Sequence, residues 1–236
     1  MTPPADLLVA WIVRQTSLEA IAWFNAKRAD LAIDSSPRAF ASIFGSVVRR
    51  MGKGTLALDA SDLAAAEKAR PRWRPNGLTG DQAARIVLLL DAARTAERFA
   101  ERVKGLAASA DLGVLVAIYK GLPLYPDPDT LVPVATEGLR TSMRPVFEAV
   151  AHQNPVPAES FPQSAWNHSV LKTLFLDSVL HPIIGLLEDK YLRAQIELAK
   201  DLDSPIMIHP PAATKNGARR APWMYSSSTG SIRPDP

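Results

Sequence analysis

Polar side chains recur at helical spacing inside apolar segments between residues 121 and 175 of the sequence. Each is charged or an amide and stands among Leu, Val, Phe and Met; they are Glu137, Arg140, Arg144, Glu148, Asn154, Asn167 and Lys172. Glu137 and Arg140 are three residues apart, and Arg144 and Glu148 four, so each pair is in contact on a helix. Charges that a helix turns inward must be paired or must contact a ligand. The pattern therefore has two interpretations, an internal ion-pair network that fixes helix packing or a pocket for an anionic or polyhydroxylated ligand.

Lys172 lies in the apolar segment of residues 170 to 175. Burial would lower the pKa of its ammonium and could make it a nucleophile or a base. The sequence places no second catalytic group beside it, which favours a lysine whose apolar stem is buried and whose ammonium reaches the surface.

The loop of residues 121 to 126 reads GLPLYP, and its two prolines stiffen a connection that leads to a predicted helix start at Asp127-Pro128. Tyr125 could line an adjacent cavity together with Tyr119 and Trp166, although aromatic side chains at such spacing are typical of a core. The candidate residues for ligand or partner binding are Glu137, Arg140, Arg144, Asn167, Lys172 and Tyr125.

The sequence carries no recognisable catalytic machinery. Its four histidines lack the close spacing of a metal site, and the chain has no cysteine, which excludes disulfides, thiol catalysis and Cys-ligated zinc. Asp127 and Asp129 flank a proline where helix capping accounts for them. GxSxG, P-loop, GxGxxG and DDxxD motifs are absent. We therefore expect no metal and no cofactor, and catalytic residues stay unassigned.

Charge and hydropathy limit the partners. The chain has 27 basic and 24 acidic residues, a net charge of +3, so its nearly neutral body argues against nucleic-acid binding. The apolar runs fall short of the roughly 20 residues that span a bilayer, and the N-terminus lacks a signal-peptide pattern. We expect a soluble, cytoplasmic protein without a transmembrane segment, with peripheral membrane contact left open.

Nearly every periodic segment repeats apolar residues at three and four positions, which predicts an all-α fold. The sequence favours a single-domain irregular multi-helix bundle or a short helical superhelix over residues 1–202, followed by a loose Pro/Ser-rich tail at 203–236. The expected helices cover residues 6–15, 17–32, 37–51, 59–69, 79–90 with a continuation or kink into 94–104, 112–120, 129–151, 162–177 and 190–202. Ser17, Ser36 before a proline, and Thr79 with Gln82 in a capping box are the expected helix starts. The helix over 112–120 is apolar nearly all round and should be central. The pattern over 129–151 contains Pro145, which predicts a kink in one long helix.

Three strings within this stretch carry a family resemblance: GLPLYPDPD, TEGLRTSMRPVFEAVAHQNPVP and WNHSVLKTLF. Together with Trp23-Phe24-Asn25 and further short elements upstream, they resemble the EboA family, small bacterial proteins encoded in a gene cluster associated with secondary metabolism. The resemblance covers roughly residues 20 to 185. The sequence departs from the family pattern at residues 47 to 50 and at His168, and no family-like text follows about residue 200.

The resemblance implies an EboA-like domain in a secondary-metabolite pathway, where the family is associated with precursor processing or export toward the periplasm. It implies a noncatalytic accessory protein that binds a small-molecule metabolite or a partner, either a pathway enzyme or a membrane protein of the same gene cluster. The alternative is a small enzyme acting on a prenylated or cyclitol-like intermediate.

Overall fold

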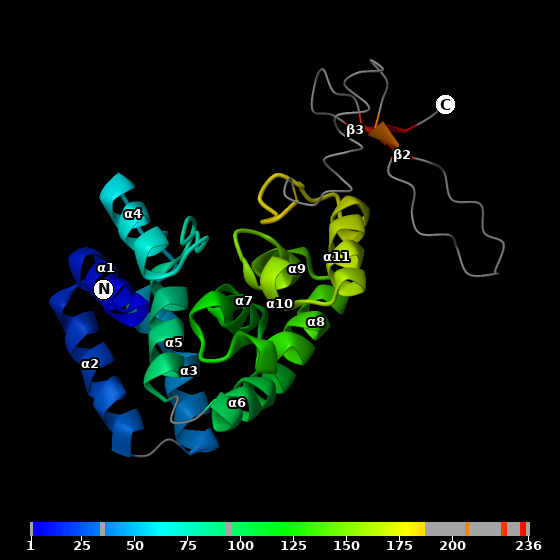
Figure 1. Ribbon diagram of the computed structural model, residues 1–236. Helices are drawn as coiled ribbons and strands as arrows, with labels where there is room; N and C mark the ends of the chain where they lie inside the picture. Colours follow the sequence, from blue (N-terminus) through cyan, green and yellow to red (C-terminus); the bar gives the residue numbers. More distant parts are fainter. Residues whose placement is uncertain are drawn as a thin grey trace. The chain divides into compact units, whose positions relative to one another are not determined.

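The computed structural model describes residues 2–33, 36–92 and 96–186, together with the short strand segments 206–207, 223–225 and 232–234 (Figure 1). The chain divides into two compact units, Met1–Ile184 and Gly185–Pro236. In the first unit all the regular elements that the structure describes are helical, as the apolar periodicity predicts. Within this described part, no helix is long and apolar enough to cross a membrane.

The N-terminal half of the first unit is made of helices, and those that begin at residues 18, 37 and 80 follow predicted capping residues. They are α1 (Pro4–Gln15), α2 (Leu18–Ile33), α3 (Pro37–Met51), α4 (Ala60–Ala69) and α5 (Gly80–Asp91). The Ser17 and Ser36 hydroxyls each accept a hydrogen bond from a backbone N–H in the first turn of their helix. The Gln82 side chain accepts one from the Thr79 backbone N–H at 3.2 Å, the return bond of the predicted capping box. Local side-chain chemistry therefore sets these boundaries.

The C-terminal half of the first unit is made of shorter elements. They are α6 (Ala96–Ser109), α7 (Leu112–Lys120), the 3-10 turns η1 (Leu122–Leu124) and η2 (Pro128–Leu131), α8 (Val132–Arg140), α9 (Arg144–Ala151), α10 (Val156–Ser160) and α11 (Gln163–Phe175). Asp127 adopts a left-handed conformation before η2, and its side chain makes no capping bond, contrary to the expectation for this residue.

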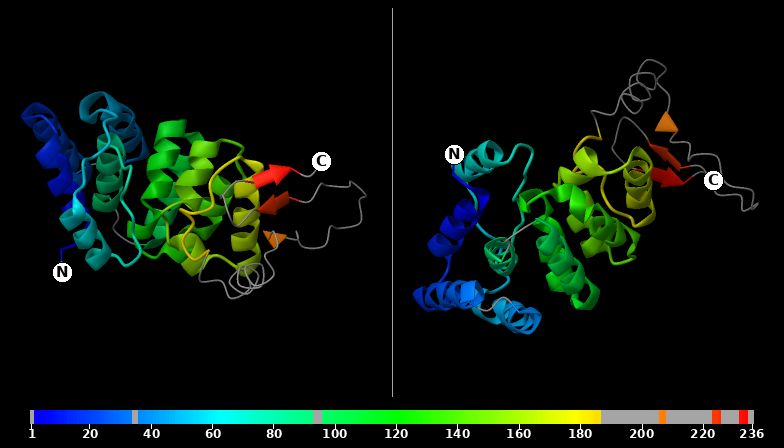
Figure 2. Two further views of the ribbon diagram at one scale, coloured as in Figure 1. Left: turned by 90° about the horizontal axis from the view of Figure 1, so that it is seen from above. Right: turned by 60° about the horizontal axis from the view of Figure 1, so that its bottom comes forward.

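Two helices form the centre of the first unit. Helix α5 contacts α1, α2, α3 and α7, and α7 contacts α6 and α9. Figure 2 shows α5 between the N-terminal helices and the elements that follow. Ile86, Leu88, Leu89 and Ile118 are fully buried, so these two helices supply much of the apolar core. The predicted central position of residues 112 to 120 is confirmed.

The prediction of one kinked helix over residues 129–151 is wrong. The chain forms η2, α8 and α9, and the backbone turns extended at Thr141 and Met143, between α8 and α9. Pro145 lies in the first turn of α9. Backbone N–H groups in a first turn have no acceptor within the helix, so the missing N–H of proline costs no hydrogen bond there. The proline thus begins a helix, and it sets no kink between two halves of one.

Gly138 allows α8 to approach both of its neighbours closely. A β-carbon at this position would lie 2.7 Å from the Tyr119 ring of α7 and 2.8 Å from a Val150 methyl of α9. Both distances are far below van der Waals contact, and both neighbours are buried. The glycine of the EGLR string therefore has a packing reason.

The second unit contains three short strands. Strand β2 (Trp223–Tyr225) pairs antiparallel with both β1 (Ile206–Met207) and β3 (Ile232–Pro234). The sequence pattern predicts no strands in this segment, because two or three residues are too few to show alternation. The predicted helix at 190–202 and the predicted domain limit after residue 202 lie outside the described residues.

We expect Gly138→Ala to lower the free energy of unfolding by about 1–3 kcal/mol, because the added methyl overpacks the α7–α8–α9 contact. Chemical denaturation measures this change. Gly105→Ala in α6 is the matched control, since its β-carbon would meet nothing within 4 Å. That control should leave stability unchanged or raise it by up to about 1 kcal/mol. Equal effects of the two substitutions would contradict the close approach at Gly138.

Candidate functional site

The predicted Glu137–Arg140 pair forms, but on the surface of α8. The Arg140 Nη1 donates to Glu137 Oε1 at 2.5 Å, and the side chains are 68% and 64% exposed. An ion pair with this exposure contributes little to stability. Neither residue is part of a buried network.

The predicted Arg144–Glu148 pair also forms, on α9. Arg144 Nε donates to Glu148 Oε1 at 2.7 Å, and the Ser178 hydroxyl donates to the same oxygen at 2.5 Å. Burial alone would raise the pKa of Glu148, but the hydrogen bonds from Ser178 and Arg144 outweigh it and lower the pKa. This carboxylate links α9 to the segment after α11.

Asn167 and Lys172 lie on different parts of α11. Asn167 is exposed, and its Oδ1 accepts a hydrogen bond from Gln163 Nε2 at 2.8 Å. Lys172 Nζ donates to the Leu139 carbonyl at 2.6 Å, near the end of α8, and lies 5.8 Å from the centre of the Phe147 ring. Burial lowers the pKa of Lys172. The lysine thus joins α11 to α8 and α9.

Tyr125 is buried in the core. Its ring packs 4.9 Å from that of Phe99, and a β-carbon on Gly121 would lie 2.2 Å from its hydroxyl. The hydroxyl oxygen is inaccessible to solvent and has no hydrogen-bond partner, and burial raises the pKa of the phenol. Of the other two aromatic side chains suggested for a cavity, Tyr119 donates to the Val134 carbonyl and Trp166 is buried.

The six candidate residues therefore do not converge on one pocket, and they do not satisfy one another in the interior. The buried ion pair of the described residues is formed elsewhere, by Asp81 and Arg85 of α5. Arg85 Nε also donates to the Phe44 carbonyl of α3 at 3.4 Å. This buried ion pair lies within α5 and bonds to α3, and it involves none of the polar residues that the spacing singled out.

A small pocket lies between three segments that are far apart in the sequence. Its lining residues come from the loop before α5, from the end of α7 and from the turn between α9 and α10; they are Trp73, Arg74, Pro75, Asn76, Leu78, Lys120, Ala149, His152, Gln153 and Asn154. None of the six sequence candidates is among them. No prediction from the sequence placed a pocket at this turn; Asn154, a polar residue in an apolar segment, and the prolines of QNPVP are the signals that could have indicated it.

The Asn154 side chain joins two of the segments that form the pocket. Its Nδ2 donates to the Tyr119 carbonyl at 3.2 Å and to the Ala149 carbonyl at 3.4 Å, while its Oδ1 accepts from the Val156 N–H at 3.1 Å. The side chain is buried, and its hydrogen-bonding groups are satisfied by backbone. Asn154 is therefore a structural residue that fixes the end of α7 against the end of α9.

Lys120 brings an ammonium group to the pocket with neutral partners alone. Nζ donates to the Gly77 carbonyl at 2.9 Å and to Gln82 Oε1 at 3.1 Å. An ammonium has three N–H donors, so one remains for a ligand. Burial lowers the pKa of Lys120, and the negative charge of Asp81 opposes that effect.

His152 also lines the pocket and has an unpaired ring nitrogen. Its Nε2 is inaccessible to solvent and has no hydrogen-bond partner. Burial lowers the pKa of His152, against the opposing effects of Glu148 and of the Val179 backbone. Because protein atoms cover Nε2, a ligand in the pocket could bond to it only if the His152 ring turned.

The size of the pocket limits what it can hold. Its volume is about 30 Å³. Each water needs roughly 10–15 Å³ of such space, so the pocket holds about two or three waters or one small functional group. It can therefore seat one end of a metabolite, while the rest of the molecule lies outside. The structure shows no group of three or more metal-ligating side chains among the residues it describes.

We expect Tyr125→Phe to leave the free energy of unfolding unchanged or to raise it by up to about 1 kcal/mol, because it removes a buried hydroxyl that has no partner. Tyr119→Phe is the matched control. It removes the bond to the Val134 carbonyl, 3.3 Å long, and should cost about 0.5–1.5 kcal/mol. Greater destabilisation by Tyr125→Phe than by Tyr119→Phe in chemical denaturation would show that the Tyr125 hydroxyl has a partner.

Comparison with known proteins agrees with the sequence motifs. The chain matches the family model described as "Metabolite traffic protein EboA" over residues 4–207, a longer stretch than the motifs alone covered. No curated protein and no solved structure matches it. The matched stretch begins at the first residue of α1 and contains all the residues that line the pocket. The chain belongs to the EboA family.

Proposed function

We propose that the protein is a noncatalytic accessory protein of metabolite traffic, and that the pocket of Lys120 and His152 binds one polar end of a metabolite. The observation that carries the proposal is the ammonium of Lys120, which lines this pocket, bonds only to two neutral groups and keeps its third N–H unused. A partly buried charge without a counter-ion is costly, so such a group beside a cavity favours a ligand. The family description supports a metabolite as that ligand.

The wider setting that we propose is a bacterial secondary-metabolite pathway, in which the protein takes part in precursor processing or export. The protein would act in the cytoplasm or at the membrane surface, beside an enzyme or a membrane protein of the same gene cluster. The exposed pair of Glu137 and Arg140 and the exposed Asn167 are proposed as the surface that meets this partner. Charged and amide groups at the rim of an interface orient the partner and select it against other proteins. Exposed side chains with few bonds inside the protein, such as these three, are free to make such contacts.

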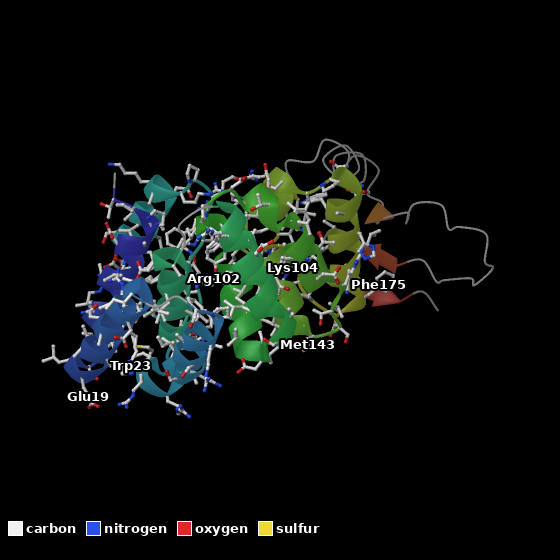
Figure 3. All side chains as sticks on the ribbon, turned by 90° about the horizontal axis from the view of Figure 1, so that it is seen from below. Glu19, Trp23, Arg102, Lys104, Met143 and Phe175 are labelled. Atoms are coloured by element: carbon white, nitrogen blue, oxygen red, sulfur yellow. The ribbon has the colours of Figure 1, made fainter. Side chains whose placement is uncertain are left out.

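We expect the full chain, immobilised and incubated with a small-molecule extract of the cells that produce it, to retain a polar compound that mass spectrometry identifies. Lys120→Met should lose this compound. Lys104→Met is the matched control, because Lys104 is an exposed lysine of α6 (Figure 3). Recovery of the compound with unchanged mass supports an accessory role, whereas a new mass supports the alternative of a small enzyme on a prenylated or cyclitol-like intermediate. If the wild-type chain retains no compound, the proposal fails.

We expect Arg140→Ala and Asn167→Ala to keep the melting temperature within about 2 °C of wild type, because both side chains are exposed and such surface substitutions change stability by about 0.5 kcal/mol or less. Pathway output in cells should fall if these residues meet the partner. Wild-type output from both variants, with unchanged protein levels, would contradict the proposed surface.

A further inference from the structure

The charged side chains that line the pocket are all basic. The lining includes two basic side chains, Arg74 and Lys120, and no acidic one. The remaining polar side chains are His152, the indole of Trp73 and the amides of Asn76, Gln153 and Asn154, and the Asn154 amide is already used by backbone. The lining therefore carries positive charge, and the indole and the free amides add N–H donors.

Among the residues that the structure describes, no carboxylate lies within ion-pair distance of Lys120. Its two hydrogen bonds go to a backbone carbonyl and to an amide oxygen, both uncharged. The acid that influences it most is Asp81, and that carboxylate is paired with Arg85 and also accepts from the Thr79 hydroxyl at 2.6 Å. A partly buried ammonium without a counter-ion is costly, so an anion beside Lys120 would be favourable.

Arg74 contributes differently. Its Nη1 donates to Glu67, which makes the Arg74–Glu67 pair neutral as a whole. Glu67 also accepts a hydrogen bond from the Arg72 backbone N–H at 3.1 Å, so both of its bonds are to the loop between α4 and α5. The net charge at the pocket is accordingly that of Lys120, with Arg74 and the amides of Asn76 and Gln153 as additional donors.

We propose that the group held in the pocket is a single anionic terminus, a carboxylate or a phosphate, bound against Lys120. This inference rests on the proposed function and names the ligand class for that same pocket. Lysine and amide donors suit both anions, and the bonds from the ammonium to an anion are charge-assisted. The volume of about 30 Å³ admits one such group. A polyhydroxylated end would satisfy the donors but would leave the charge of Lys120 uncompensated.

The test uses the full chain and four probes at constant ionic strength, with chloride as the reference anion. Sodium phosphate and sodium acetate represent the two anions, and glycerol and inositol represent neutral polyols. Nuclear magnetic resonance of the His152 ring and of the Lys120 backbone amide reports binding at the pocket, and titration gives the dissociation constant. Phosphate or acetate should shift both signals, with saturation in the millimolar range expected for so small a ligand.

Two variants and a control make the result specific. Lys120→Met should weaken anion binding at least tenfold, and Asn76→Ala should weaken it by a smaller factor without loss of folding, since the Asn76 side chain is exposed. Lys104→Met should bind like wild type. Comparing phosphate with acetate decides which anion the pocket prefers.

The outcomes separate this inference from the function on which it rests. Binding of glycerol or inositol without phosphate or acetate would overturn the anionic class and leave metabolite binding at this pocket intact. Anion binding that Lys120→Met and Lys104→Met reduce equally would show general surface attraction and would also overturn it. Failure of all four probes to shift either signal would count against the pocket as a binding site and thus against both proposals.

Discussion

The side-chain amide of Asn154 is the interaction on which the pocket depends. One buried amide makes three backbone hydrogen bonds, to the carbonyls of Tyr119 and Ala149 and from the N–H of Val156. It thereby joins the end of α7 to the end of α9 and the start of α10. Lys120 follows Tyr119 directly, and His152 precedes Asn154 by two residues, so the same amide positions both of these lining residues of the pocket. Leaving such a group unpaired costs about 1–3 kcal/mol, enough to hold the arrangement in one state.

Close contacts between α7, α8 and α9 stabilise the helices that carry the pocket. Gly138 lets α8 approach Tyr119 of α7 and Val150 of α9, and Gly121 makes room for the Tyr125 ring. The helices that carry the pocket are thus packed at distances which a single methyl group would disturb. This packing gives physical reasons for the glycines in the GLPLY and EGLR strings, and it explains why Tyr125 is buried in the core. A rigid frame of this kind lowers the entropy cost of binding, because the polar groups are ordered before the ligand arrives.

Local chemistry made much of the fold predictable. Ser36 followed by Pro37, and Thr79 with Gln82, predicted helix starts that the structure contains. The apolar pattern of α7 predicted its central place. The start of α9 was not predictable at Pro145, because an interior proline and a proline at a helix start have the same sequence signature when the preceding residues 141–143 fit a helical pattern. The strands of the second unit were missed because their runs are too short to show a period.

The site was less predictable, for a physical reason. Spacing along one helix correctly indicated which charges pair, as for Arg144 and Glu148, but it did not show that the Glu137–Arg140 pair lies at the surface. The pocket is built by tertiary contacts between residues 73–78, Lys120 and residues 149–154, and no local pattern links these segments. Asn154 was recognised as a polar residue in an apolar setting, yet its role in joining α7 to α9 follows only from its bonds.

A crystal structure of the full chain that shows ordered water would test the central claim most directly, namely that protein groups leave one N–H of Lys120 unsatisfied beside an open pocket. We expect density that is not protein, either water or a small ligand, within hydrogen-bond distance of Lys120 Nζ. A pocket closed by a side chain, or a carboxylate of the protein paired with Lys120, would contradict the claim.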